Sequence, residues 1–230
     1  MKKLRLLHVV FNTTIEAHEI AAFRGAIVEK VGPEHILFHN HLSDDEFVQS
    51  YPLIQYKRVG RKPSLFCVEQ GVDEIYRFFV NKEWNMVMAG RELNMSVSSL
   101  NLKEYTLRIT RDRLNYRISN WLALNRDNYA EFDKIPALAD RIAKLESILT
   151  ANILSFAKGI NWTIEDKIEL RLSDISKAKL LGYKGVKLTG FDAEFSANIF
   201  LPNYLGLGKG VSHGFGTIKQ MDAGEGRSSR

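Results

Sequence analysis

The chain has 230 residues, of which 45% are hydrophobic and 26% are charged, and these are the proportions of an ordinary globular protein rather than a low-complexity one. The single cysteine, Cys67, excludes an internal disulfide and suits a reducing compartment. The formal net charge of +5 and the pI of about 9.2 mildly favour a polyanionic partner.

No targeting segment is expected at the start of the sequence. The first residues are basic and then apolar, but the apolar run stops after Phe11 without a small-residue cleavage site, which indicates a strand rather than a signal peptide. No apolar run approaches the roughly 20 residues that cross a membrane. We therefore expect a cytoplasmic protein.

The first hundred residues predict one ferredoxin-like domain. Residues 4–11 form a nearly continuous apolar run, as in an internal strand. Thr13 and Glu16 have capping-box spacing and predict a helix that ends at Gly32, with one apolar face formed by Ile20, Phe23, Ile27 and Val31. Four elements follow: strands at 53–59 and 64–69, a helix at 71–81, and a closing strand at 86–89. The order is βαββαβ.

The second half repeats this order less clearly. Its predicted elements are strands at 104–110 and 114–124, a helix after Pro136, and strands at 167–172, 184–188, 193–200 and 215–219. No clear second helix is visible, although residues 173–181 could form a short one. We predict an α+β protein of two tandem ferredoxin-like (RRM-like) βαββαβ domains, at 1–100 and 101–220, with a C-terminal glycine-rich loop and a disordered tail at 221–230.

Five glycines lie between positions 206 and 216. Such a segment permits positive φ angles and brings backbone N–H groups near a ligand, which suits phosphate contact. A Walker loop or a dinucleotide-binding loop fits poorly, because Lys209 is followed by Gly210 and the segment leads into a strand instead of a helix. A glycine-rich hairpin without a ligand is the remaining alternative.

The glycine-rich segment resembles the C-terminal signature of the RAMP superfamily, and most closely that of the CRISPR repeat-processing endoribonucleases, the Cas-six family. The matching residues are Gly206, Gly208, Lys209, Gly210, Gly214, Phe215 and Gly216. Three further stretches are similar to the b-type branch of that family: Arg24-Gly25-Ala26, His39-Asn40-His41 and the Tyr-Pro-Leu-Ile-Gln-Tyr-Lys run at 51–57.

The resemblance implies cleavage of CRISPR precursor RNA without a metal or another cofactor. A ribose 2′-OH would attack the adjacent phosphate and leave a 2′,3′-cyclic phosphate and a 5′-OH. Histidine can serve as the base or the acid near neutral pH. His39 and His41 are the first candidates, because the family often places its catalytic histidine between the first helix and the next strand. His18 is the second, and Tyr51 and Lys57 complete the predicted catalytic set.

Basic and glycine residues form the predicted RNA-binding set, because cations neutralise phosphates and make binding depend on salt. The set consists of Arg58, Arg61, Lys62, Arg111, Arg113, Arg117, Gly206, Gly208, Lys209, Gly210, His213, Gly214, Phe215 and Gly216. For His213, contact with RNA is favoured over proton transfer.

Other functions remain open at this point. His39-Asn40-His41 does not indicate an HNH nuclease, whose metal ligands are spread over a ββα unit, although the acidic residues at 44–46 beside these histidines could bind a divalent ion. The expected partner is CRISPR repeat RNA, with effector-complex subunits or a second copy of the chain as further partners. The alternatives are a non-catalytic RNA-binding RAMP-type subunit of a CRISPR effector complex and a metabolic ferredoxin-like protein that binds a small ligand.

Overall fold

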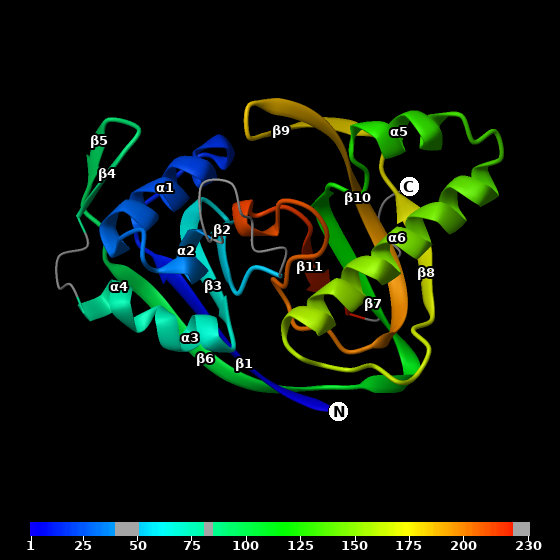
Figure 1. Cartoon of the computed structure of the whole chain (residues 1–230), viewed down its shortest axis with the longest axis horizontal. Coiled ribbons are helices and arrows are strands. Elements are labelled where there is room, and N and C mark those ends of the chain that lie inside the picture. Colours follow the sequence, from blue (N-terminus) through cyan, green and yellow to red (C-terminus); the bar gives the residue numbers. More distant parts are fainter. Residues whose placement is uncertain (40–50, 81–84, 223–230) are drawn as a thin grey trace. The chain divides into compact units, whose positions relative to one another are not determined.

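The structure, a computed structural model, describes residues 1–39, 51–80 and 85–222. Its contacts divide the chain into two compact units, each traced in Figure 1. The N-terminal unit contains Lys3–Thr106 and Ser212–Gly214; the C-terminal unit contains Met1–Lys2, Leu107–Val211 and the chain from Phe215 onward. Among the described residues, no helix is long and apolar enough to cross a membrane.

A four-stranded sheet with the order β2–β3–β1–β6 forms the base of the N-terminal unit. Its strands are β1 (Lys2–Phe11), β2 (Ile54–Val59), β3 (Lys62–Val68) and β6 (Val97–Leu107). The pairs β1–β3 and β2–β3 are antiparallel. The apolar run predicted as an internal strand is confirmed, because β1 has a hydrogen-bonded neighbour on each side.

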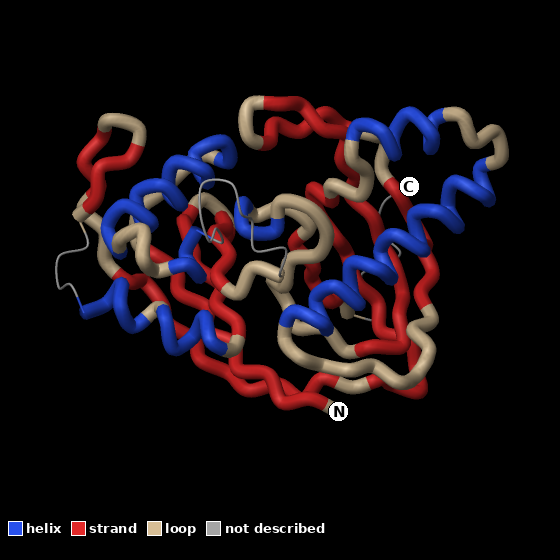
Figure 2. The backbone as a smooth tube through the Cα atoms, in the orientation of Figure 1, coloured by secondary structure: helices blue, strands red, loops and turns tan. Residues whose placement is uncertain are grey.

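Helices pack on one face of this sheet (Figure 2). They are the 3-10 helix η1 (Ala17–Glu19) and the α-helices α1 (Ile20–Val31), α2 (Ile36–His39), α3 (Gln70–Glu74) and α4 (Tyr76–Val80). The core lies between helices and sheet, where Phe23 and Ile27 of α1 meet Val9 and Phe11 of β1. This burial of apolar area is the main term that holds the unit together.

The predicted closing strand of this unit is wrong. The run predicted at 86–89 is β4 (Met86–Met88), which pairs only with β5 (Arg91–Leu93) in a separate two-stranded sheet. The strand that completes the main sheet is β6 at its edge. Most β6 side chains are exposed, so the apolar pattern that identifies buried strands is absent from it.

Two helix details of the N-terminal unit also differ from prediction. The helix predicted over 71–81 is divided at Ile75 into α3 and α4. The capping box is formed by Glu16 and Glu19 rather than by Thr13 and Glu16, so the helical segment begins three residues later than expected.

The C-terminal unit has a second sheet with the equivalent order, β11–β7–β10–β8, and β9 pairs with β10. Its strands are β7 (Ile109–Trp121), β8 (Leu170–Ile175), β9 (Lys179–Tyr183), β10 (Val186–Ile199) and β11 (Thr217–Gln220). The helix predicted after Pro136 is confirmed as α6 (Leu138–Gly159), which follows the short helix α5 (Arg126–Asp133). Leu145, Leu149 and Ile153 of α6 are buried.

No α-helix occupies the second helix position of the C-terminal unit. The short helix suggested for 173–181 is wrong, because β8 and β9 occupy that stretch. After β10 the chain instead runs through the glycine-rich segment, which contains only the 3-10 turn η2 (Val211–His213) before β11. Leu205 and Leu207 in this segment are fully buried, so the segment itself contributes apolar side chains to the core.

Candidate active site

His18 is exposed and lies in η1, immediately before α1. The carboxylate of Glu19 accepts a hydrogen bond of 2.7 Å from the backbone N–H of Glu16, which closes the capping box. That hydrogen bond, followed by the charge of Arg91, holds the pKa of Glu19 below its ordinary value. The segment that carries His18 is therefore held by the capping box of Glu16 and Glu19.

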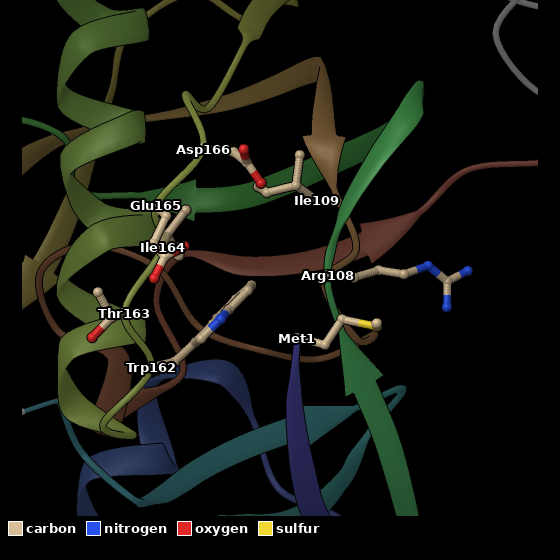
Figure 3. Close-up of a pocket in the computed structure, with 8 residues that line it drawn as sticks. All are labelled: Met1, Arg108, Ile109, Trp162, Thr163, Ile164, Glu165 and Asp166. Atoms are coloured by element: carbon tan, nitrogen blue, oxygen red, sulfur yellow. The ribbon is translucent and has the colours of Figure 1, made fainter.

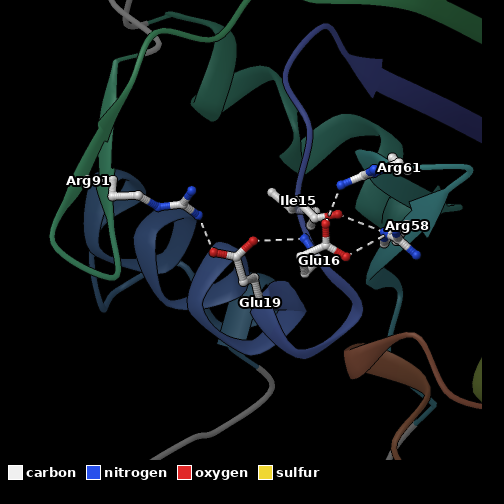
Figure 4. Close-up of polar contacts among 6 residues, drawn as sticks. All are labelled: Ile15, Glu16, Glu19, Arg58, Arg61 and Arg91. Carbon is white, nitrogen blue, oxygen red and sulfur yellow. Dashed lines mark hydrogen bonds and ion pairs between the residues drawn. The ribbon is translucent and has the colours of Figure 1, made fainter.

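Three arginines bind these two carboxylates (Figure 4). Arg61 contacts Glu16, and Arg91 contacts Glu19. Arg58 lies 3.6 Å from Glu16. Arg58 and Arg61 were predicted to bind RNA, but each is partly neutralised within the N-terminal unit. Their contact with RNA remains a prediction.

The tip of the glycine-rich segment, Ser212–Gly214, belongs to the N-terminal unit. Gly214 has a φ of +83°, and a Cβ there would lie 3.1 Å from the carbonyl oxygen of Tyr56 and 3.2 Å from Cδ1 of Ile20. Beside it, the Nδ1 of His213 is 3.1 Å from the Ser212 hydroxyl. The tip therefore places Gly214, the neighbour of His213, against β2 and against the start of α1, two residues beyond His18.

Lys57 and Tyr51 are both buried. Lys57 is 2% exposed, and burial lowers the pKa of its amine to about 7. The hydroxyl of Tyr51 accepts a hydrogen bond of 2.7 Å from the Gln55 amide. A buried lysine of this kind must be uncovered before it can contact a phosphate, so the predicted role of Lys57 requires a rearrangement around β2.

His39 forms the end of α2. Its Nε2 is 2.6 Å from the carbonyl oxygen of Pro33, and because a carbonyl only accepts, Nε2 carries the proton in this arrangement. The backbone carbonyls at the end of α2 accept hydrogen bonds from Tyr56 and Arg24. Arg24 lies one turn after Ile20 on α1, so the backbone of His39 and the glycine-rich tip both contact this helix, through Arg24 and Ile20 respectively. His41 lies outside the described residues.

The glycines of the C-terminal unit have packing roles that are visible in the structure. A Cβ on Gly216 would lie 1.9 Å from the carbonyl oxygen of Leu207, and one on Gly208 would lie 3.0 Å from the Trp121 indole nitrogen. Gly210 packs against Phe215 and Tyr183. The segment is thus a closely packed hairpin, and phosphate contact by its backbone remains a prediction.

The basic residues of β7 differ in their surroundings. Arg113 pairs with Glu169 at 2.9 Å, and Arg117 pairs with Glu194 at 2.5 Å. Arg111 is exposed, and in the described part of the chain no carboxylate lies within ion-pair distance of it. On the glycine-rich segment, the Lys209 amine lies 5.7 Å from the centre of the Tyr183 ring. In the N-terminal unit, the remaining predicted cation, Lys62, donates a hydrogen bond to Ser98.

A hollow of about 480 Å³ opens on the C-terminal unit (Figure 3). Its lining residues are Met1, Arg108, Ile109, Trp162, Thr163, Ile164, Glu165 and Asp166. None of them belongs to the catalytic set predicted from the sequence, and Arg108 is the one lining residue whose side-chain charge suits an RNA path. Among the described residues, no group of three or more His, Cys, Asp or Glu side chains could hold a metal ion.

Two family models match almost the whole chain. The model of the Cas6b N-terminal domain matches residues 2–106, and that of the Cas6b C-terminal domain matches residues 108–221. The chain belongs to the Cas6b family. The resemblance drawn from the glycine-rich segment and the 51–57 run is therefore confirmed.

Solved Cas6b structures share this fold along nearly the full chain. A crystal structure of Cas6b has a TM-score of 0.85 and 27% identity, and covers 96% of this chain and 100% of that one. A CRISPR RNA processing endoribonuclease Cas6b has a TM-score of 0.73 and 25% identity with the same coverage. An uncharacterized protein of Methanocaldococcus jannaschii is 34% identical over 146 residues, which are 57% of this chain and 98% of that protein. The two tandem ferredoxin-like domains are thus confirmed as the Cas6b fold.

Several residues of the candidate site were not found from the sequence. Glu16 and Glu19 have capping spacing, which was a usable signal, but it was assigned one turn too early. Arg24 lies in a stretch that was noticed only for its resemblance. Its contact with the end of α2 joins residues 15 positions apart, and no local pattern reports such a contact.

Proposed function

We propose that this Cas6b protein is an endoribonuclease that cuts CRISPR precursor RNA within the repeat. The observation that carries the proposal is the match of both Cas6b family models across residues 2–221, together with the likeness to a Cas6b that is described as a CRISPR RNA processing endoribonuclease. The substrate is a polyanion, which suits the net charge of +5.

The proposed reaction needs no metal. A base removes the proton from the ribose 2′-OH, the 2′-oxygen attacks the adjacent phosphorus, and the bond from phosphorus to the 5′-oxygen breaks. An acid returns a proton to that 5′-oxygen, so the products are a 2′,3′-cyclic phosphate and a 5′-OH. His39 or His41 and His18 are proposed for these two proton transfers. The contacts around the start of α1 support this choice, because they bring the segments of His18, His39 and His213 to one helix.

Cleavage of a 5′-labelled CRISPR repeat RNA in excess EDTA tests the proposal. A parallel substrate carries a 2′-deoxy substitution at the nucleotide before the cut. We expect a single cut that persists in EDTA and disappears with the deoxy substrate. Tight, salt-sensitive binding without any cut would instead assign the chain to RNA-holding RAMP-type subunits, and absence of binding would overturn an RNA function altogether.

A further inference from the structure

The carbonyl groups at the end of α2 are bound by side chains from two other elements. The last carbonyls of a helix have no partner within that helix. Here the Tyr56 hydroxyl of β2 donates a hydrogen bond of 2.9 Å to the carbonyl of Phe38, and a guanidinium nitrogen of Arg24 donates to the carbonyl of His39. Two consecutive carbonyls of a four-residue helix are therefore held from outside it.

The two donors are themselves held in place. Tyr56 is fully buried, and its ring packs edge-on against Phe23 with 5.9 Å between ring centres. The Arg24 guanidinium lies 5.9 Å from the centre of the Tyr56 ring. Burial also raises the pKa of Tyr56, so its hydroxyl keeps its proton and stays a donor. Because the Arg24 guanidinium is charged, its hydrogen bond to the last carbonyl of α2 is charge-assisted.

The ring of His39 depends on the position of this backbone. The Nε2 of His39 donates a hydrogen bond to the carbonyl of Pro33, which precedes α2. The backbone carbonyl of His39 accepts a hydrogen bond from Arg24. A shift of the helix end would move the imidazole relative to Pro33 and to α1. Misplacement of a reacting group by about 1 Å can reduce a rate by roughly 10²-fold.

We propose that Arg24 and Tyr56 are positioning residues that fix His39 for the cleavage step, an inference that depends on the function proposed above. They act through the backbone of Phe38 and His39 and need no contact with the RNA. This assigns a role to Arg24, a half-buried residue whose guanidinium contacts the end of α2 and lies over the Tyr56 ring.

Tyr56→Phe tests the inference with a matched control in the other unit. Tyr116 is also fully buried, and its hydroxyl donates a hydrogen bond of 2.9 Å to the carbonyl of Ile199. Tyr116→Phe therefore removes a similar hydroxyl far from His39 in sequence. We expect Tyr56→Phe to lower the single-turnover rate at saturating repeat RNA about tenfold, with the Kd for RNA within about twofold of wild type. Tyr116→Phe should leave both quantities within about twofold.

Two substitutions of Arg24, Arg24→Met and Arg24→Lys, form the second part of the test. Methionine keeps much of the apolar stem but removes the donor, so the rate should fall about tenfold or more. Lysine keeps a charged donor and should recover part of that loss. Equal rates for Tyr56→Phe and Tyr116→Phe, or a loss in Arg24→Met that appears in RNA affinity instead of in rate, would overturn the positioning role.

A readout without RNA separates this inference from the proposed function. A ¹⁵N spectrum of the histidine rings in the free protein reports whether Nε2 of His39 carries the proton. We expect this signature in the wild type and its change in Arg24→Met. If the wild type does not cut repeat RNA, the proposed function fails. An unchanged ring spectrum in Arg24→Met would overturn the positioning role by itself.

Discussion

The two units share a strand order but differ at the second helix position. In the N-terminal unit α3 and α4 follow the third strand of the sheet, whereas in the C-terminal unit the glycine-rich segment stands there. Leu205 and Leu207 of that segment are fully buried, and four of its glycines have positive φ angles that allow the backbone to turn. The freed tip, Ser212–Gly214, joins the N-terminal unit beside α1 and β2. The glycine-rich segment thus contributes three residues from the C-terminal half of the chain to the N-terminal unit, which carries the candidate histidines His18 and His39.

The largest expected effect is the loss of cleavage on replacing a catalytic histidine, and it compares His39 and His41 with His213 of the glycine-rich tip. His39→Ala or His41→Ala should reduce single-turnover cleavage about 10²- to 10⁴-fold, as expected for a general acid or base. His213→Ala, on the glycine-rich tip, should cost less than about tenfold, because we assign it to RNA contact. If both His39→Ala and His41→Ala kept full activity, our assignment of the catalytic histidines would be wrong.

Gly216 and Gly60 allow backbone strain to be separated from close packing. Both have a φ of +61°, but a Cβ on Gly60 meets nothing within 4 Å, whereas one on Gly216 meets the carbonyl of Leu207 at 1.9 Å. Gly60→Ala should lower the free energy of unfolding by about 1 kcal/mol. Gly216→Ala should lower it by about 3 kcal/mol, since overpacking adds to the same strain. Urea denaturation measures both, and equal losses would mean that the segment adapts to the added methyl group.

The fold was predictable where burial leaves a pattern. The inner strand β1 is a continuous apolar run, and α1 and α6 have apolar residues at helical spacing. Most of β6 was missed, because an exposed edge strand lacks that pattern. Only its last four residues fall within the strand predicted at 104–110, and the short apolar run of β4 was predicted as the closing strand instead. The glycine-rich segment was identified by its composition, but its role as a substitute for a helix depends on contacts with distant residues such as Trp121 and Asn152.

The candidate site was predictable in its residue types but not in its contacts. Histidines, basic residues and glycines could be named, yet the sequence does not tell which arginine faces RNA and which faces a carboxylate. Arg61 looks like part of a basic turn, but Glu16, its partner, lies 45 positions earlier in the chain. Spacing along the sequence carries no information about such a pair.

The two units also differ in their buried polar residues. Among the described residues these are Gln55, Lys57 and Ser64, and all three lie in the N-terminal unit. The pKa of Lys57 is about 7 in the folded chain and 10.5 for an ordinary lysine. Between pH 7 and pH 10.5, Lys57 is mostly protonated in the unfolded chain and mostly neutral in the folded chain. Its contribution to the free energy of unfolding therefore rises by about 1.4 kcal/mol for each unit by which the pH increases.

Lys57→Met removes this contribution. We expect the variant to be more stable than the wild type at pH 7.5, by an amount that decreases by about 1.4 kcal/mol per pH unit up to pH 9.5. Urea denaturation of both proteins across this range measures the difference, because titrations common to the two cancel. A difference that does not change with pH would indicate that Lys57 stays charged in the folded protein.

A substitution at Gly214 tests whether the position of the glycine-rich tip affects the cleavage rate when the stability of the fold changes little. Its would-be Cβ is 3.1 Å from the carbonyl of Tyr56, so Gly214→Ala should displace the tip slightly from α1 and β2. We expect cleavage to fall about tenfold, with a loss of unfolding free energy close to the roughly 1 kcal/mol of backbone strain alone. An unchanged rate would show that the tip position does not matter for the chemistry.

The smallest effect concerns the RNA path on β7. Arg111→Ala should weaken RNA binding and reduce the slope of log K against log salt by about 1. Arg113→Ala should change that slope less, because Glu169 already neutralises much of its charge. Filter binding at several salt concentrations measures both slopes. Equal slopes for the two variants would mean that RNA displaces Glu169 from Arg113.

The pairing of β7 with β11 also affects how the protein reaches its folded state. Ser119 pairs with Thr217, so one edge of β7 has no neighbour until a strand almost a hundred residues later has been synthesised. Contacts between such distant positions slow folding, and an open strand edge favours aggregation in the meantime. The glycine-rich segment immediately precedes that last strand, so a nascent chain completes its second sheet only after the glycine-rich segment has been synthesised.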